Sequence, residues 1–255
     1  MKKLVAMLVL AAGLSAFATP VNITVVGATQ VSSIWYGIPV TDQVPPGDNE
    51  VMPGNTPANA WDMEAVLLDG NNLSLVGSYD WANGVPSENV STGDLFVAVN
   101  GSSTYNYALR FNFTSSTYDV YHLSSTSTYV VPGTPGYFDL TSCPFEVNAS
   151  TAKDIGSYGF QYQTGLSDNA ALGYTSWTAG PVYDGFGPTT HNEITVDLAN
   201  FLTLTTGEEI ATHITMSCGN DELNGHGRVP EPGSLSMILV GLMSIVGLAI
   251  SRKRK

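Results

Sequence analysis

The chain has 255 residues, with 22 acidic against 9 basic side chains and a net charge of −13 at pH 7. Six of the basic residues lie at the two ends, in 2–3 and 252–255, which leaves only Arg110, Lys153 and Arg228 between them. Such an acidic field repels phosphate backbones and anionic head groups, so it argues against nucleic-acid binding. Cations and neutral glycans remain open as partners.

The first 18 residues have the three parts of a secretory signal peptide. Lys2 and Lys3 give a positive start, and residues 4–14 are almost wholly apolar. Ala16 and Ala18 then occupy the −3 and −1 positions of an A-x-A site, so we expect cleavage after Ala18. The apolar run is too short for a stable membrane anchor, which disfavours an uncleaved N-terminal anchor.

Residues 19–228 form the foldable part, which is long enough for one domain with a sizeable core. Apolar and polar residues alternate over 104–113, and a Thr-Ser-Ser turn at 114–116 leads into 117–123, so we predict a hairpin there. An Asp-Gly pair within 69–72 predicts a tight turn. Further strands are expected at 21–26, 63–68, 72–78, 95–99, 129–131, 158–163, 193–198, 202–205 and 211–217.

Helical patterning is absent from the sequence between the two ends. No stretch there carries a sustained apolar stripe at helical spacing with caps, and charged residues make up only 12% of the chain. The expected fold is therefore all-β, an antiparallel β-sandwich or jelly-roll. The proline-rich stretch 43–59 is expected to be a long loop within this domain, because too little chain precedes it for a separate one.

Two cysteines, Cys143 and Cys218, remain in the foldable part. In an oxidising compartment an even count favours a disulfide. That bond would close a loop of about 75 residues and stabilise the fold by ~4 kcal/mol in the chain-entropy model. The alternative is two buried thiols that do not meet, and two sulfurs without spaced histidines do not make a metal site.

Catalytic signatures are absent from the sequence: it has no nucleophile elbow, H-E-x-x-H motif, phosphate loop or dinucleotide fingerprint. Among the histidines, His226 is expected in a glycine-rich exit linker, His213 in a strand and His191 in a turn before a strand. Asp62 and Glu64 would share one face of a strand, as paired glycosidase carboxylates do, but such spacing arises by chance among so many acids. We therefore expect no catalytic residues and no enzyme.

The sequence contains residue types that could bind two kinds of ligand, calcium and glycans. Asp- and Asn-rich clusters at 48–50, 69–72, 168–169 and 220–222 offer oxygen ligands, but none has the spacing of a calcium loop, so structural calcium is only a minority alternative. The tryptophans provide flat faces on which sugars could stack, although a core position is the commoner fate. They are Trp35, Trp61, Trp81 and Trp177. Exposed tryptophans would favour a glycan-binding module, and buried ones a structural protein.

The C-terminal 27 residues have the parts of a second processing signal. A Pro-Glu-Pro motif lies in 229–233, the uncharged apolar run 234–250 is just long enough to cross a bilayer, and a basic cluster ends the chain. That cluster is Arg252, Lys253, Arg254 and Lys255. By the positive-inside rule the cluster stays in the cytoplasm and the passenger lies on the far side of the membrane. The prolines on both sides of Glu231 keep the motif extended, as a processing enzyme requires.

Pro230, Glu231 and Pro232, followed by an apolar span and a terminal basic cluster, resemble the PEP-CTERM sorting signal of Gram-negative bacteria. The stretch T-H-I-T-M-S-C-G-N-D at 212–221 resembles the segment that ends many passengers of this family, where it is the last strand and turn before a linker. The resemblance implies export through the secretory translocon and signal peptidase. It also implies transient anchoring in the inner membrane and cleavage by exosortase near the motif.

The same resemblance implies a location at the cell surface, in the outer envelope or in the extracellular matrix, in association with biofilm or exopolysaccharide. The expected role of the passenger is structural or adhesive. The alternatives are a lectin-like glycan-binding module, a glycan-cleaving enzyme and an ordinary protein with a single membrane span. A GPI signal fits less well, because it would normally end in its apolar tail.

Overall fold

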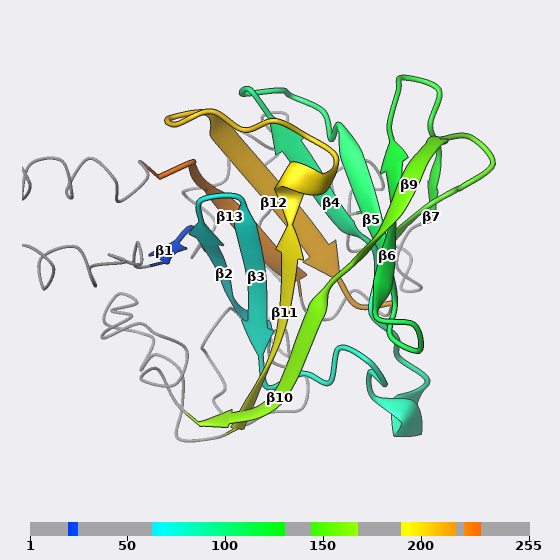
Figure 1. Ribbon diagram of the computed structural model, residues 1–255. Helices are drawn as coiled ribbons and strands as arrows, with labels where there is room; N and C mark the ends of the chain where they lie inside the picture. The colour runs from blue at the N-terminus through cyan, green and yellow to red at the C-terminus, as the bar shows by residue number, and fades with distance from the viewer. Residues whose placement is uncertain (1–19, 25–62, 131–143, 168–189, 218–221, 231–255) are drawn as a thin grey trace, which may run out of the picture.

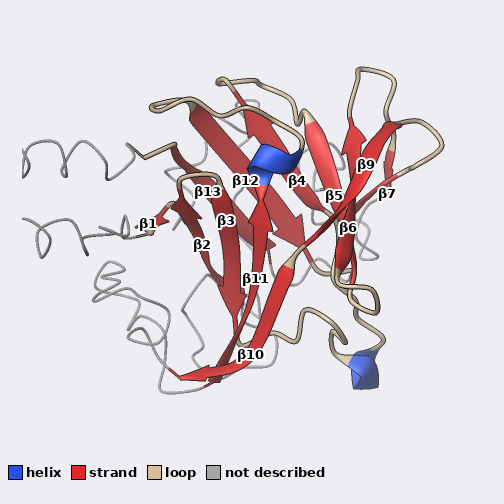
Figure 2. Ribbon diagram, in the orientation of Figure 1, coloured by secondary structure: helices blue, strands red, loops and turns tan. Residues whose placement is uncertain are grey.

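The computed structural model describes residues 20–24, 63–130, 144–167, 190–217 and 222–230. These residues form antiparallel strands and two short 3-10 helices (Figure 1 and Figure 2), which confirms the all-β class. The strands are β1 Val21–Asn22, β2 Met63–Asp69, β3 Asn72–Gly77, β4 Leu95–Val99, β5 Tyr107–Asn112, β6 Thr117–His122, β7 Tyr129–Val130, β8 Glu146–Val147, β9 Lys153–Gly159, β10 Gln161–Ser167, β11 Thr190–Asp197, β12 Glu209–Thr215 and β13 Glu222–Arg228. The 3-10 helices are η1 Pro86–Glu88 and η2 Leu198–Asn200.

The strands form two main sheets. One has the order β1-β2-β3-β11-β10, the other has the order β13-β12-β4-β5-β6-β9, and β7 pairs with β8 as a separate ribbon. The apolar residues of the two inner faces pack together in one buried cluster. Its fully buried members include Leu68, Leu75, Ile194, Leu95, Leu109, Tyr118, Ile210 and Ile214.

The predicted hairpins are confirmed. β5 pairs with β6 from Tyr107–His122 to Asn112–Thr117. β2 pairs with β3 through a turn in which Gly70 has a φ of +59°, a value that glycine adopts without steric cost. Alternation marked the β5–β6 hairpin, whereas β2 was found as an apolar run in which Ala65, Val66, Leu67 and Leu68 are all buried.

Three predictions about strands were wrong. The single strand expected at 158–163 is instead the end of β9, Phe160 and the start of β10. Residues 202–205 are not a strand, because Leu202 and Leu204 pack against the core from a loop that follows η2. The T-H-x-T stretch is not the last strand before a linker, because its strand, β12, pairs along its whole length with β13. β13 was missed because glycines occupy inward positions where apolar residues would normally mark a strand.

The two sheets are bridged at one edge by a continuous run of chain. β9 pairs with β6 in one sheet, and β10 pairs with β11 in the other. Only Phe160 separates the two strands, and its N–H donates to the Ser116 carbonyl oxygen at 3.1 Å. Its ring makes edge contacts with Phe111 and Phe113, with centroids 5.3 Å apart in each case. This aromatic corner lets a single run of chain serve both sheets.

The opposite edge is closed by the first described residues, as the adjacent positions of β1 and β13 show (Figure 1). Ile23 donates to the Val66 carbonyl oxygen at 2.9 Å, and its own carbonyl oxygen accepts from His226 N at 2.7 Å. The approach is close because β13 has glycines on its inner face. A Cβ at Gly225 would lie 2.5 Å from Thr212 Oγ1, and one at Gly227 would overlap the Ile23 side chain. We call the contact of Ile23 with Gly227 and the His226 backbone the β1–β13 seam.

The outer face of the six-stranded sheet is partly covered by the β7–β8 ribbon. Phe96, Ala108 and Tyr121 form a second apolar cluster with Val147 of β8. Asp94, just before β4, fastens this cover: it makes a two-point ion pair with Arg110 (Nε–Oδ1 3.0 Å, Nη2–Oδ2 2.8 Å).

The same ion pair holds the backbone of β8. Asp94 Oδ2 accepts from Val147 N at 2.8 Å, and Arg110 Nη2 donates to the Val147 carbonyl oxygen at 2.7 Å. Burial raises the pKa of Asp94 to about 6 although Arg110 favours its charged form, so the carboxyl is ionised at pH 7.

We predict that Gly227→Ala lowers the free energy of unfolding by about 2 kcal/mol, because the added methyl group overlaps Ile23. In an Ile23→Gly background, which also removes the Ile23 Cβ that would lie 2.9 Å from the new methyl group, the same change should cost much less, as a double-mutant cycle of denaturant unfolding measures. Gly159→Ala is the control, since the nearest atom to its new Cβ, the Ser116 carbonyl oxygen, is 3.9 Å away. Equal costs of Gly227→Ala in both backgrounds would show that the seam is not packed as described.

We also predict that Asp94→Ala destabilises the protein by about 3 kcal/mol, because the half-buried Arg110 guanidinium keeps only the more distant carboxylate of Glu146, at 3.7 Å. Glu88→Ala, at an exposed position in η1, should change stability by less than about 0.5 kcal/mol. Chemical denaturation at pH 7 provides the measurement. Indistinguishable midpoints for the two variants would contradict the role assigned to the Asp94–Arg110 pair.

Candidate functional site

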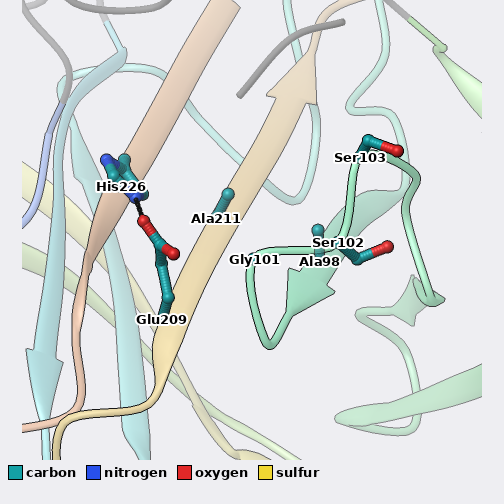
Figure 3. A pocket seen from close by; sticks show the side chains of 7 residues that line it. All are labelled: Ala98, Gly101, Ser102, Ser103, Glu209, Ala211 and His226. Atoms are coloured by element: carbon teal, nitrogen blue, oxygen red, sulfur yellow. Dashed lines mark hydrogen bonds and ion pairs between the residues drawn. The ribbon is translucent and has the colours of Figure 1, made fainter. Parts of the chain in front are cut away.

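A pocket of about 200 Å³ lies on the outer face of the six-stranded sheet. Figure 3 shows Glu209 and His226 on one side of Ala211 and the loop after β4 on the other. The lining residues are Ala98, Gly101, Ser102, Ser103, Glu209, Ala211 and His226. They come from β4, β12, β13 and one loop, so the pocket exists only when the sheet is assembled.

The pocket is hollow because small side chains occupy paired positions on neighbouring strands. Ala211 of β12 lies opposite Ala98 of β4 on one side and His226 of β13 on the other. Two residues further along the same face, His213 lies opposite Phe96, and larger side chains fill the space. The methyl groups of the two alanines therefore provide an apolar floor at the point where the larger residues end.

The polar wall of the pocket is the pair formed by Glu209 and His226. His226 Nε2 lies 2.7 Å from Glu209 Oε1, and both side chains are about one-third exposed, at 30% and 36% respectively. Because a carboxylate can only accept, the imidazole carries its hydrogen on Nε2. The His226 backbone is fixed in turn by its hydrogen bond to Ile23 at the β1–β13 seam. Hydrogen bonds to the ring of His226 and to its backbone N–H therefore both fix the orientation of this wall.

The opposite wall consists of the loop after β4. Gly101 has a φ of +64°, and a Cβ there would lie 3.1 Å from Glu209 Oε2, so glycine lets the loop approach the carboxylate. Ser102 Oγ donates to the Thr104 carbonyl oxygen at 2.7 Å, and the loop is tied to β12 by Asn100 N donating to the Glu209 carbonyl oxygen at 2.9 Å. Ser102 is therefore held by its own loop and does not form a nucleophile–base pair with His226.

The prediction that His226 lies in an exit linker was wrong, because it is a residue of β13. His191 is also not in a turn: it lies within β11 and is fully buried. The Glu209–His226 pair was missed because its members are 17 positions apart and meet only across the β12–β13 register. The alternation of Asn224, His226 and Arg228 with smaller residues was the one available signal for a strand.

His213 lies two residues from the pocket floor and is buried, with an exposed fraction of 1%. Its Nδ1 is 2.8 Å from Asn224 Oδ1, and its ring lies near Phe96 and Tyr105. Burial lowers the pKa of His213 to about 4, and hydrogen bonds to Asn224 and the Pro144 backbone only partly offset this effect. The histidine of the T-H-x-T stretch is therefore a neutral core residue.

Several other predicted positions are outside the described residues. These are the signal cleavage residues Ala16 and Ala18, the cysteines Cys143 and Cys218, Glu231 and Pro232 of the sorting motif, the apolar run 234–250, the basic cluster 252–255, and Trp35, Trp61 and Trp177. Asp62 and the side chain of Glu64 are likewise not described. Trp81 is described: it is 1% exposed and donates from Nε1 to the Asn192 carbonyl oxygen at 3.3 Å.

The neighbours of the two cysteines lie close to each other. Gly93 N donates to the Thr215 carbonyl oxygen at 3.0 Å, and Asp94 N donates to that of Phe145 at 2.8 Å. Phe145 is two residues from Cys143, and Thr215 is three residues from Cys218. The disulfide remains a prediction, and this arrangement of the flanking segments is compatible with it.

Among the described ranges, no group of three or more histidine, cysteine or acidic residues is arranged to hold a metal ion. The predicted calcium cluster at 69–72 is the β2–β3 turn. Within the same ranges, no helix is long and apolar enough to cross a membrane. No known protein family, curated protein or solved structure matches the chain.

We predict that His213→Gln reduces the loss of stability on acidification. The folded-state pKa of about 4 is below the unfolded value near 6.5, so the unfolded chain binds the additional proton and native stability falls between these two values. This term has a limiting slope of about 1.4 kcal/mol per pH unit. Asp94 acts with the opposite sign, because its folded pKa is raised, and is common to both proteins.

The measurement is the difference in unfolding free energy between the wild type and His213→Gln from pH 7 to pH 4.5. The wild type should lose its advantage progressively as the pH falls. A constant difference over this range would mean that the buried imidazole is not held neutral.

Proposed function

We propose that this chain is an exported surface or matrix protein whose all-β passenger, a β-sandwich or jelly-roll, is processed at both ends. The N-terminal segment 1–18 acts as a signal peptide, and 229–255 acts as a PEP-CTERM-like sorting tail with a single transmembrane helix. The observation that carries the proposal is the fixed order of the Pro-Glu-Pro motif, the uncharged span and the basic cluster at the C-terminal end of the sequence.

The position where β13 ends supports this proposal. β13 ends at Arg228, and Val229 still belongs to the fold: its N–H donates to the Glu208 carbonyl oxygen, and its own carbonyl oxygen accepts from Gly207 N, both at 2.9 Å. Pro230, the first residue of the motif, follows directly and has no N–H with which to extend the strand. The last described strand therefore ends just before the proposed recognition sequence.

The N-terminal end gives independent support. β1 begins at Val21, three residues after the predicted cleavage site at Ala18, and the seam places it beside β13. Both address segments are thus joined to the domain at one edge of the sandwich. A domain arranged in this way can be tethered to a membrane at either end without any change in its fold.

In this proposal the partners are the secretory translocon, signal peptidase and an exosortase, with a transient stay in the inner membrane. The mature passenger then serves a structural or adhesive role at the cell surface or in an exopolysaccharide matrix. Trp81 supports this class over a tryptophan-based lectin, because its ring is in the core and makes an edge contact with Tyr79 at 5.4 Å. The competing hypotheses are a lectin-like glycan-binding module, a glycan-cleaving enzyme and an ordinary single-span protein.

We predict that Glu231→Gln leaves export unaffected and blocks removal of the tail, because the change deletes the charge of the motif while keeping its shape. Glu88→Gln, on an exposed 3-10 turn far along the chain from the motif, is the matched control and should be processed normally. Mass spectrometry of protein recovered from the producing cells distinguishes the forms. Normal trimming of Glu231→Gln would sink the sorting proposal, and a wild type that itself keeps 234–255 would indicate a plain membrane anchor.

A further inference from the structure

We propose that the pocket beside Glu209 and His226 binds a single ring of a neutral saccharide. The proposal concerns a ligand of the folded domain and does not depend on how the chain is sorted. It rests on three features of the pocket: its shape, its hydrogen-bonding groups and its charge.

The shape suits one small ring with an apolar face. The paired alanines Ala98 and Ala211 are only 5% and 4% exposed, so their methyl groups form the bottom of the hollow and do not project into it. A pyranose ring has C–H groups on its faces and hydroxyl groups around its edge, so it can cover such a floor while its edge meets polar walls. A volume of about 200 Å³ leaves no space for a long chain segment lying within the pocket.

The polar wall provides the hydrogen-bonding groups that hydroxyls need. Glu209 accepts one bond from His226 at Oε1, and a carboxylate has further lone pairs on both oxygens. With His226 Nε2 engaged by the carboxylate, Nδ1 accepts from a hydroxyl when the imidazole is neutral and donates to one when it is charged. A sugar hydroxyl both donates and accepts, so it fits either form of the ring.

Charge selects a neutral ligand. The chain carries a net charge of −13, and the acidic residue that lines the pocket is Glu209, so an anionic sugar or a phosphate would be repelled. A metal ion is not favoured either, because the pocket offers only Glu209 and His226 as strong ligands, fewer than a protein metal site needs. The site therefore discriminates by hydroxyl geometry and by the absence of charge.

The positioning of the wall supports a binding role. His226 is held by the Ile23 carbonyl oxygen through its backbone and by Glu209 through its ring, and Gly101 leaves space beside Glu209 Oε2. Groups fixed in this way lose little conformational freedom when a ligand binds. The pair therefore offers its remaining lone pairs in one arrangement.

The test uses protein recovered from the producing cells, with whatever ends it carries there, and saturation-transfer difference NMR with the methyl glycosides of glucose, galactose and mannose. Glucuronate is the anionic comparison. We expect transfer to at least one neutral glycoside and none to glucuronate. Transfer to glucuronate alone, or to no neutral glycoside, would overturn the proposal.

Two variants locate the binding. Ala211→Phe fills the hollow, and Glu209→Gln keeps the shape of the side chain but removes its charge; each should weaken binding by about tenfold or more. Glu193→Gln is the matched control, because it changes a partly buried glutamate on β11 of the other sheet, and it should bind as the wild type does. Retained binding in Glu209→Gln would refute the site even if Ala211→Phe failed to fold.

Discussion

Closure of the sandwich depends on one contact, the packing of Ile23 against the glycine face of β13. A strand with ordinary side chains at 225 and 227 could not approach so closely, because any Cβ there would overlap Thr212 or Ile23. The consequences extend to both ends of the domain. The seam joins the first described strand to the last and fixes the backbone of His226 in the pocket wall.

The second constraint is the burial of polar groups in the six-stranded sheet. Asp94, His213, Thr212 and Thr215 are all nearly inaccessible to solvent. Asp94 is balanced by Arg110, one of only three basic residues in the foldable part, and the pair fastens the ribbon that covers the sheet. In an acidic domain with few basic residues, one of them therefore neutralises a buried carboxylate.

The strands that could be predicted from the sequence are those whose buried positions carry large apolar side chains. β2, β3, β4 and the β5–β6 hairpin alternate or run apolar in the expected way, and an Asp-Gly pair marks one of their turns. β13 lacks that signal, because Gly225 and Gly227 stand where bulky residues would be expected. Side chains distant in the sequence require these glycines: Thr212 and Val66 at Gly225, and Ile23, some 200 positions away, at Gly227. The stretch 202–205 shows the opposite case: its leucines are half-buried by the core but have no strand to pair with.

The candidate site was less accessible to prediction than the fold. A histidine and a glutamate 17 positions apart have no motif in common, and only the register of β12 with β13 brings them together. The floor of the pocket is defined by small residues, which a search for chemistry-bearing side chains passes over. The two processing signals proposed at the ends of the chain, by contrast, are predicted from local sequence, because translocation and processing machinery acts on short linear segments.

We propose that this β-rich domain is a passenger between two processing signals, and the intact mass of the mature protein from its native host tests this proposal most directly. A mass that begins near Thr19 and ends near Pro230 to Pro232, with or without an added group, is the predicted result. A mass that retains residues 234–255 would contradict it and identify the chain as a permanently anchored single-span protein.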